Sequence, residues 1–310
     1  MTRKQFSSGD VIADRRADYA RMLMEAGDHA AAAELWEQAL ELAPDWAAGW
    51  FRLGEAAEKA GLKDKAVEAY ARAAELDKEG VFGAALKLAL LGAAPVPEAP
   101  PSAYVEGLFD DYAERFETAL VEKLNYSVPA KLFSLVEPHG PFRLTVDLGC
   151  GTGLFGVEAA GATARLEGYD LSANMLAKAA QKSLYHHLAQ ADLSLAAEQS
   201  GLFSQEHPRH RADLVSAADV LMYLGALDNA FDLAAALLMP GGFFAFSVED
   251  AGDGSGFRLQ DSLRYAHSEA YVRQLLTAKG FDLVETRKTE IRMDAGKPVH
   301  GMLFLARRTS

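Results

Sequence analysis

The chain is poor in cysteine, in positive charge and in long apolar runs, and each shortage excludes a class of protein. Its 310 residues include one cysteine, Cys150, so neither an internal disulfide nor a cysteine metal cluster is possible. The formal net charge of −13 argues against non-specific binding to nucleic acid or to an anionic membrane. No run of about eighteen apolar residues and no charged-then-apolar leader is found, so we expect a soluble, cytoplasmic protein.

Glycine, in contrast, is concentrated in residues 144–156, LTVDLGCGTGLFG. The largely apolar first half of this stretch indicates a buried strand that contains one acid, Asp147. Three glycines follow in quick succession: Gly149, Gly151 and Gly153. They predict a tight turn, after which a helix starts at about Leu154. Glycines let a ligand approach the main chain closely, and the N–H groups that open the helix would face that ligand.

Two kinds of ligand fit such a turn. Gly151, Gly153 and Gly156 match the G-x-G-x-x-G fingerprint of dinucleotide-binding proteins, with an acid, Asp170, about twenty residues further on. The wider string, Asp147 followed by G-x-G-x-G, resembles motif I of the class I S-adenosylmethionine (SAM) methyltransferases. This resemblance implies that the glycine loop lies against the methionine part of SAM. It also implies that the acid of the motif helps to hold the amino-acid end.

Later segments resemble the same family, in the family's order. Asp170 ends a predicted second strand, and D-L-S-x-x-M resembles the segment whose acid accepts both ribose hydroxyls. Asp192 follows a third strand over 184–191, where the family's acid accepts the adenine amino group. The turn 238–242, LMPGG, precedes a fifth strand and is a further landmark of the family. A dinucleotide enzyme would not be expected to combine all of these.

The segment after a fourth strand, 212–216, resembles the E-V-L-x-H-like segment at the mouth of the methyl-transfer site. Asp219 matches the acid, but Tyr223 stands where a histidine is common, so the sequence departs from the family there. Tyr223 either shapes the pocket, hydrogen-bonds a substrate, or only packs. We assign Asp219 and Tyr223 to the candidate catalytic residues.

The stretch 250–267 is expected to emerge at the same edge as a flexible acidic loop that closes over the opening as a lid. Arg264 would bind an acidic substrate, with Tyr265 beside it, and His267 would act as the base that removes a proton from the acceptor. The competing interpretation is that Ser268 caps the next helix and that its neighbours are solvated.

The N-terminal part is helical and repeats itself after about 34 residues, the tetratricopeptide (TPR) period. The shift superposes Tyr19 on Leu53, Ala20 on Gly54, Gly27 on Gly61, Ala32 on Ala66, Trp36 on Tyr70 and Ala39 on Ala73. We therefore predict a tail over 1–14, two TPR-like repeats with a capping helix over 15–92, and a proline-rich linker over 93–101. The methyltransferase part would occupy 102–310.

The start of that last part, Phe109-Asp110-x-Tyr112-Ala113, matches an N-terminal segment that closes over the cofactor in many SAM methyltransferases. We expect either that Tyr112 contacts SAM or the substrate, or that it only packs on the domain. The cofactor residues implied by the resemblance are Tyr112, Asp147, Gly149, Cys150, Gly151, Gly153, Asp170, Leu171, Met175, Asp192 and Leu193.

The predicted fold class is α/β, with a Rossmann-like, seven-stranded methyltransferase sheet preceded by a small all-α TPR domain. The whole arrangement resembles the bacterial family of predicted TPR-containing methyltransferases. The implied function is methyl transfer from SAM, without a metal, to a small-molecule or protein acceptor. The TPR helices would bind a partner or mediate self-association. The alternative is a SAM-binding regulatory or scaffold protein without turnover.

Overall fold

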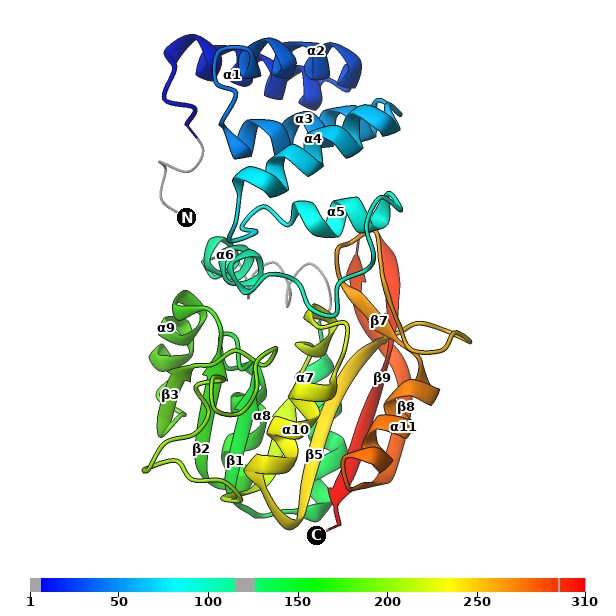
Figure 1. The fold of residues 1–310 in the computed structure, drawn as a ribbon. Helices are drawn as coiled ribbons and strands as arrows, with labels where there is room; N and C mark the ends of the chain where they lie inside the picture. Colours follow the sequence, from blue (N-terminus) through cyan, green and yellow to red (C-terminus); the bar gives the residue numbers. More distant parts are fainter. Residues whose placement is uncertain (1–6, 115–125, 295, 310) are drawn as a thin grey trace. The chain divides into compact units, whose positions relative to one another are not determined.

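The computed structural model describes residues 7–114, 126–294 and 296–309 (Figure 1). The chain divides into two compact units, Met1–Tyr104 and Val105–Ser310. Within the described ranges, no helix has both the length and the apolarity needed to cross a membrane.

The first unit is helical, and its helices follow one another with short connections. They are α1 (Val11–Glu25), α2 (His29–Leu40), α3 (Ala47–Lys59), α4 (Lys63–Leu76) and α5 (Ala84–Leu90). The first helix starts earlier than the expected Arg15, because the Asp10 carboxylate accepts hydrogen bonds from the N–H groups of Ile12 and Ala13. The tail expected over 1–14 is therefore too long, and this boundary is corrected to the residue before Val11.

The repeat read from the sequence is visible in how these helices pack. Gly27 and Gly61 occupy equivalent corners between paired helices, and both have positive φ, 82° and 74°. At Gly54 a Cβ would lie 2.5 Å from the ring of Tyr70, so only glycine lets α3 approach α4 this closely. The small residues thus stand where helices touch, and large side chains such as Trp36 fill the spaces between them.

The second unit is built on one sheet. Its strands are β1 (Phe142–Leu148), β2 (Thr163–Asp170), β3 (His187–Gln190), β4 (Ala212–Ala217), β5 (Leu238–Asp250), β6 (Phe257–Leu259), β7 (Tyr265–His267), β8 (Phe281–Asp294) and β9 (Lys297–Arg308). Parallel strands run in the order β3-β2-β1-β4-β5, and β9 lies antiparallel between β5 and β8. The predicted α/β class is confirmed, and β8 and β9 form an antiparallel pair at the C-terminal end of the chain.

Helices cover both faces of this sheet. They are α7 (Val128–Val136), α8 (Leu154–Ala159), α9 (Ala173–Gln181), α10 (Asp228–Leu237) and α11 (Glu269–Ala278), while α6 (Ser102–Tyr112) contacts the segments that follow β2 and β4. Ala245 packs in the core under α7 and α8. Its neighbours Phe244 and Phe246 point the opposite way, to Phe231 of α10, with ring centroids 5.3 and 5.1 Å apart. α10 and α11 lie together on this second face (Figure 1).

The sheet differs from the expectation in one region. The seven expected strands are present as β3, β2, β1, β4, β5, β9 and β8. The stretch 250–267, expected to be a flexible lid, adds two short strands, β6 and β7. β7 pairs in parallel with β5 at Glu249↔Ala266 and Asp250↔His267, beyond the last pair that β4 forms with β5. The last part of the stretch is therefore an ordered extension of the sheet, which corrects the lid interpretation.

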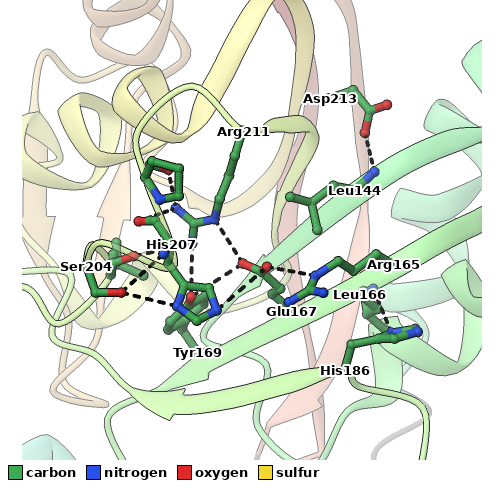
Figure 2. A network of polar contacts seen from close by, with 12 residues as sticks. Leu144, Arg165, Leu166, Glu167, Tyr169, His186, Ser204, His207, Arg211 and Asp213 are labelled. Atoms are coloured by element: carbon green, nitrogen blue, oxygen red, sulfur yellow. Dashed lines mark hydrogen bonds and ion pairs between the residues drawn. The ribbon is translucent and has the colours of Figure 1, made fainter.

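A buried polar network fixes the long connection between β3 and β4 (Figure 2). Glu167 of β2 accepts from Arg211 at 3.0 Å and from Arg165 at 3.2 Å. Arg211 also donates to the hydroxyl of Tyr169 and to the carbonyl of Pro208, both at 2.9 Å. Burial alone would raise the pKa of Glu167, but the guanidinium of Arg211 outweighs it and holds the pKa below its usual value.

Candidate functional site

The glycine turn joins β1 to α8 at the carboxyl edge of the sheet. Gly149, Gly151 and Gly153 have φ of 63°, 55° and 89°, which favour glycine. A Cβ on Gly149 would lie 2.3 Å from Val220, so glycine lets the segment after β4 approach the turn after β1. Strand order reverses between β1 and β4, and ligands of open α/β sheets bind at such a switch point.

Asp147 is tied to protein groups under this turn. Its side chain accepts from the hydroxyls of Tyr185 at 2.7 Å and Ser216 at 2.8 Å. Burial raises the pKa of Asp147 to about 7, against the effect of these two hydroxyls. The ring of Tyr185 also occupies the space beside Gly156, where a Cβ would lie 2.5 Å from its oxygen. Sequence analysis missed Tyr185, and the expected contact of Asp147 with SAM stays a prediction.

Asp170 ends β2 beside the glycine turn and is 9% exposed. Its carboxylate accepts from the N–H of Gly151 at 2.8 Å and of Ser172 at 2.9 Å. Burial raises the pKa of Asp170 to about 6, although the backbone donors oppose the shift. A carboxylate has about four acceptor positions, so two remain for hydroxyl groups of a ligand.

A buried hydroxyl in the same turn also fits a ligand. Thr152 is 2% exposed, and its Oγ1 has no hydrogen-bond partner among the described residues. Buried polar groups are normally hydrogen-bonded, and leaving one unsatisfied costs about 1–3 kcal/mol. A polar ligand seated on the glycine turn would satisfy this group, so the residues present fit the cofactor that the sequence predicts.

The other expected cofactor residues lie in neighbouring turns of the same edge. Asp192 follows β3, and its Oδ1 accepts from the N–H of Ser194 at 2.8 Å and from its hydroxyl at 2.6 Å. Burial raises the pKa of the Cys150 thiol well above its usual value, which agrees with a packing role. Three apolar residues complete the set: Leu171 is half-buried, and Met175 and Leu193 are buried.

α6 extends over this edge from the end of β2 toward the segment after β4. Asp110 accepts from the hydroxyl of Ser172 at 2.5 Å, and Ser172 in turn caps α9. The ring of Phe109 stands edge-on to Tyr223, with centroids 4.9 Å apart. Tyr112 is half-buried at the end of α6, and its contact with SAM or substrate stays a prediction. Phe109 and Asp110, which make these two contacts, belong to the F-D-x-Y-A segment, but only Tyr112 of that segment was predicted as a site residue.

The segment after β4 carries the two candidate catalytic residues. Asp219 has φ of 58°, and its N–H donates to the hydroxyl of Ser247 at 2.8 Å. Both of its carboxylate oxygens accept from Nη1 of Arg292 at 2.9 Å. Burial raises the pKa of the Tyr223 hydroxyl to about 12, so it stays protonated at neutral pH. Sequence analysis missed Arg292, which reaches Asp219 from β8, far away in the sequence.

The three expected acceptor-side residues are engaged with protein groups to different degrees. His267 is fully buried, donates from Nε2 to the Gly225 carbonyl at 2.9 Å, and has its pKa lowered by burial to about 4. Arg264 forms ion pairs with Glu249 at 3.0 Å and with a second carboxylate. Tyr265 is fully buried in β7. Pairing of β7 with β5 buries Tyr265 and His267, which corrects their assignment as substrate ligand and base. Arg264 is half-buried and lines a cavity with Glu249 and Asp294, so its role as a substrate ligand stays a prediction.

Comparison with protein families agrees with this geometry. Residues 146–244, from β1 into β5, match the family model of a methyltransferase domain. This chain carries a methyltransferase domain. Residues 13–56 match the model of the tetratricopeptide repeat, so both sequence resemblances are confirmed. No curated protein matches the chain.

Solved structures place the methyltransferase domain in a known fold. The 1,6-didemethyltoxoflavin-N1-methyltransferase of Burkholderia thailandensis, with bound 1,6-didemethyltoxoflavin and S-adenosylhomocysteine (SAH), is 20% identical with a TM-score of 0.53 over 70% of this chain and 94% of that one. The magnesium protoporphyrin IX methyltransferase of Synechocystis PCC 6803, with bound SAH, is 20% identical. Its TM-score is 0.51 over 67% of this chain and 99% of that one. The [4+2]-cyclase SpnF is 17% identical, with a TM-score of 0.54 over 69% of this chain and 98% of that one. At these identities the likeness shows the fold.

Proposed function

We propose that the methyltransferase domain binds SAM at the β1–β4 switch point and transfers its methyl group to an acceptor. The observation that carries this proposal is Asp170, whose buried carboxylate stands beside the glycine turn with two acceptor positions unused. Ribose presents two adjacent hydroxyls, which match these positions. Asp192, after the next strand, would accept from the adenine amino group, and the glycine turn would lie along the methionine part.

When bound, SAM supplies a methyl group on a sulfonium, so alignment of the acceptor is the main task of the protein. α6 and Tyr223 would cover the reacting centre and exclude water from it. Asp219 is the candidate proton acceptor that remains at the opening, since burial of His267 lowers its pKa to about 4 and the Gly225 carbonyl already accepts its Nε2–H. The acceptor is a small molecule or a protein. The TPR part would bind a partner or mediate dimerisation.

A second candidate function is a SAM-binding regulatory protein without turnover. It is favoured by the full burial of His267, the expected base, because burial lowers its pKa to about 4. The likeness to a [4+2]-cyclase also shows that this fold is not restricted to methyl transfer. The two candidates share cofactor binding and differ only in the acceptor step.

Isothermal titration calorimetry of the full chain with SAM and SAH tests the shared step. The titration is run with and without EDTA, because no group of three or more His, Cys, Asp or Glu side chains in the described ranges is arranged to hold a metal. We expect binding in both buffers with the same affinity. Absence of binding to either ligand would refute the proposal, and binding that is lost in EDTA and restored by a divalent metal would refute its metal-free form.

A further inference from the structure

A largely buried ion-pair cluster lies near the ends of β5 and β8, beside the segment after β4. Arg292, with 4% of its side chain exposed, holds both oxygens of Asp219 through Nη1 and contacts Glu249 through Nη2. Arg264 donates to the same Glu249 oxygen at 3.0 Å and also pairs with Asp294. The cluster therefore joins three carboxylates to two guanidinium groups: the buried Asp219 and Glu249 are matched by Arg292 and Arg264, and the third carboxylate, Asp294, is 45% exposed.

On the side of the glycine turn, Lys182 donates to the Thr152 carbonyl at 2.8 Å. Among the described residues, Asp147 and Asp170 form no ion pair with a lysine, arginine or histidine, and both are at least nine-tenths buried. Burial raises the pKa of Asp170, and the neighbouring Asp110 raises it further. Buried charge is unfavourable in a medium of low dielectric constant unless a counter-charge is close. The β1–β4 switch point is thus suited to a ligand that carries positive charge.

Asp219 is the member of the cluster that reaches the switch point. Its neighbour Val220 packs on Gly149 of the cofactor turn, where a Cβ would lie 2.3 Å from Val220. The main chain of Asp219 is held in the left-handed region by its bond to Ser247, and aspartate tolerates this conformation better than most residues. Arg292 fixes the carboxylate from the other side. Backbone and side chain are therefore both positioned before any ligand binds.

We propose that Asp219 is the counter-charge for the sulfonium of SAM, that Arg292 positions it, and that the site thereby distinguishes SAM from SAH by charge. This proposal rests on the proposed function. Methyl transfer breaks the bond between sulfur and the methyl carbon, and its electron pair stays on sulfur while the acceptor lone pair forms the new bond. Sulfur becomes neutral in SAH, so the attraction to Asp219 is lost and release of the product is favoured.

Calorimetry with three ligands tests this role without knowledge of the acceptor. SAM carries the sulfonium, SAH a neutral thioether, and sinefungin a protonated amine at the equivalent position. The variant Asp219→Asn keeps shape and tolerance of positive φ but removes the charge. The control Asp294→Asn makes the same charge change at the outer end of the cluster, where the side chain is 45% exposed.

We expect Asp219→Asn to weaken SAM and sinefungin by about tenfold and SAH by less than about twofold, as removal of a nearby charge at an effective dielectric constant of about 20 implies. Asp294→Asn should leave the ratio of SAM to SAH affinity unchanged. An equal loss for all three ligands, or no loss, would overturn the charge assignment. If the wild-type protein binds none of them, the proposed function itself fails.

A second variant covers the case in which Asp219→Asn does not fold, which thermal unfolding without ligand detects. Asp219→Glu keeps the negative charge beside Arg292. We expect it to retain the wild-type ratio of SAM to SAH affinity within about threefold. A folded Asp219→Glu protein that binds SAH normally but loses the preference for SAM would contradict the proposal.

Discussion

Replacing Asp170 by asparagine should weaken SAM binding while leaving the free protein about as stable as before. The side chain keeps its shape and one oxygen acceptor, so either the N–H of Gly151 or that of Ser172 retains its partner. The ionised carboxylate, which the ribose hydroxyls are proposed to use, is removed. Loss of affinity and loss of stability are therefore separated in this variant.

The expected magnitudes follow from the surroundings of Asp170. Burial raises its pKa from 3.8 to about 6, so at pH 7 the ionised group destabilises the free folded state by about 3 kcal/mol. Asparagine removes this penalty but leaves one buried N–H without an acceptor, which costs about 1–3 kcal/mol. The two terms nearly cancel. In the complex, two charge-assisted hydrogen bonds become neutral ones, and we expect a loss of affinity of about 10- to 100-fold.

Two measurements decide this prediction. Thermal unfolding without ligand compares stability, and calorimetry with SAM compares affinity. Asp253→Asn, at an exposed position of the 250–256 loop, is the control for the charge change. A folded Asp170→Asn protein with wild-type affinity for SAM would refute the ribose assignment.

Three further predictions concern pH, the network of Figure 2 and the division of the chain. Lowering the pH from 7 to 5 should weaken SAM binding, because SAM needs ionised Asp170 and protons compete for that carboxylate. Below the pKa of about 6 the loss of affinity should approach tenfold per pH unit, and a calorimetric affinity that does not change with pH would contradict this. Arg211→Met leaves buried Glu167 with Arg165 as its remaining arginine partner. Urea unfolding should therefore show a loss of about 3 kcal/mol in the free energy of unfolding, and a loss under about 0.5 kcal/mol would show that the ion pair is dispensable. Limited proteolysis should cut first within 93–101, and a 102–310 fragment should still bind SAM; aggregation of the fragment would show one cooperative unit.

The sequence was sufficient to predict the fold class and the order of the motifs. Motif I and Asp170 are local patterns whose spacing reflects strands followed by tight turns, so they can be read without tertiary information. The TPR repeat is predictable for the same reason, because each repeat places glycine and alanine where helices touch. The expected turn over 238–242 instead forms the start of β5, where Leu238 pairs with Ala212. The start of α1 was missed because Asp10 caps the helix, and the cap preceded the repeat pattern used to find it.

The acceptor side could not be predicted, because it depends on pairings between distant segments. A polar run rich in glycine, 250–256, suggested a loop, but Tyr265 and His267 gain burial when β7 extends the sheet beside β5. Arg292 meets Asp219 across strands far apart in sequence, and nothing local indicates that contact. Tyr185 likewise reaches Asp147 from the turn after α9. Contacts of this kind follow from the topology of the sheet.

Methyl transfer itself is tested most directly with SAM labelled on the methyl group. The full-length protein is incubated with labelled SAM and a native extract, and mass spectrometry follows both labelled products and the formation of SAH. The account predicts label in a discrete acceptor, with one SAH formed per methyl transferred, and little label with Asp170→Asn. Binding of SAM without label and without SAH formation would contradict the enzyme assignment and favour a regulatory SAM-binding protein.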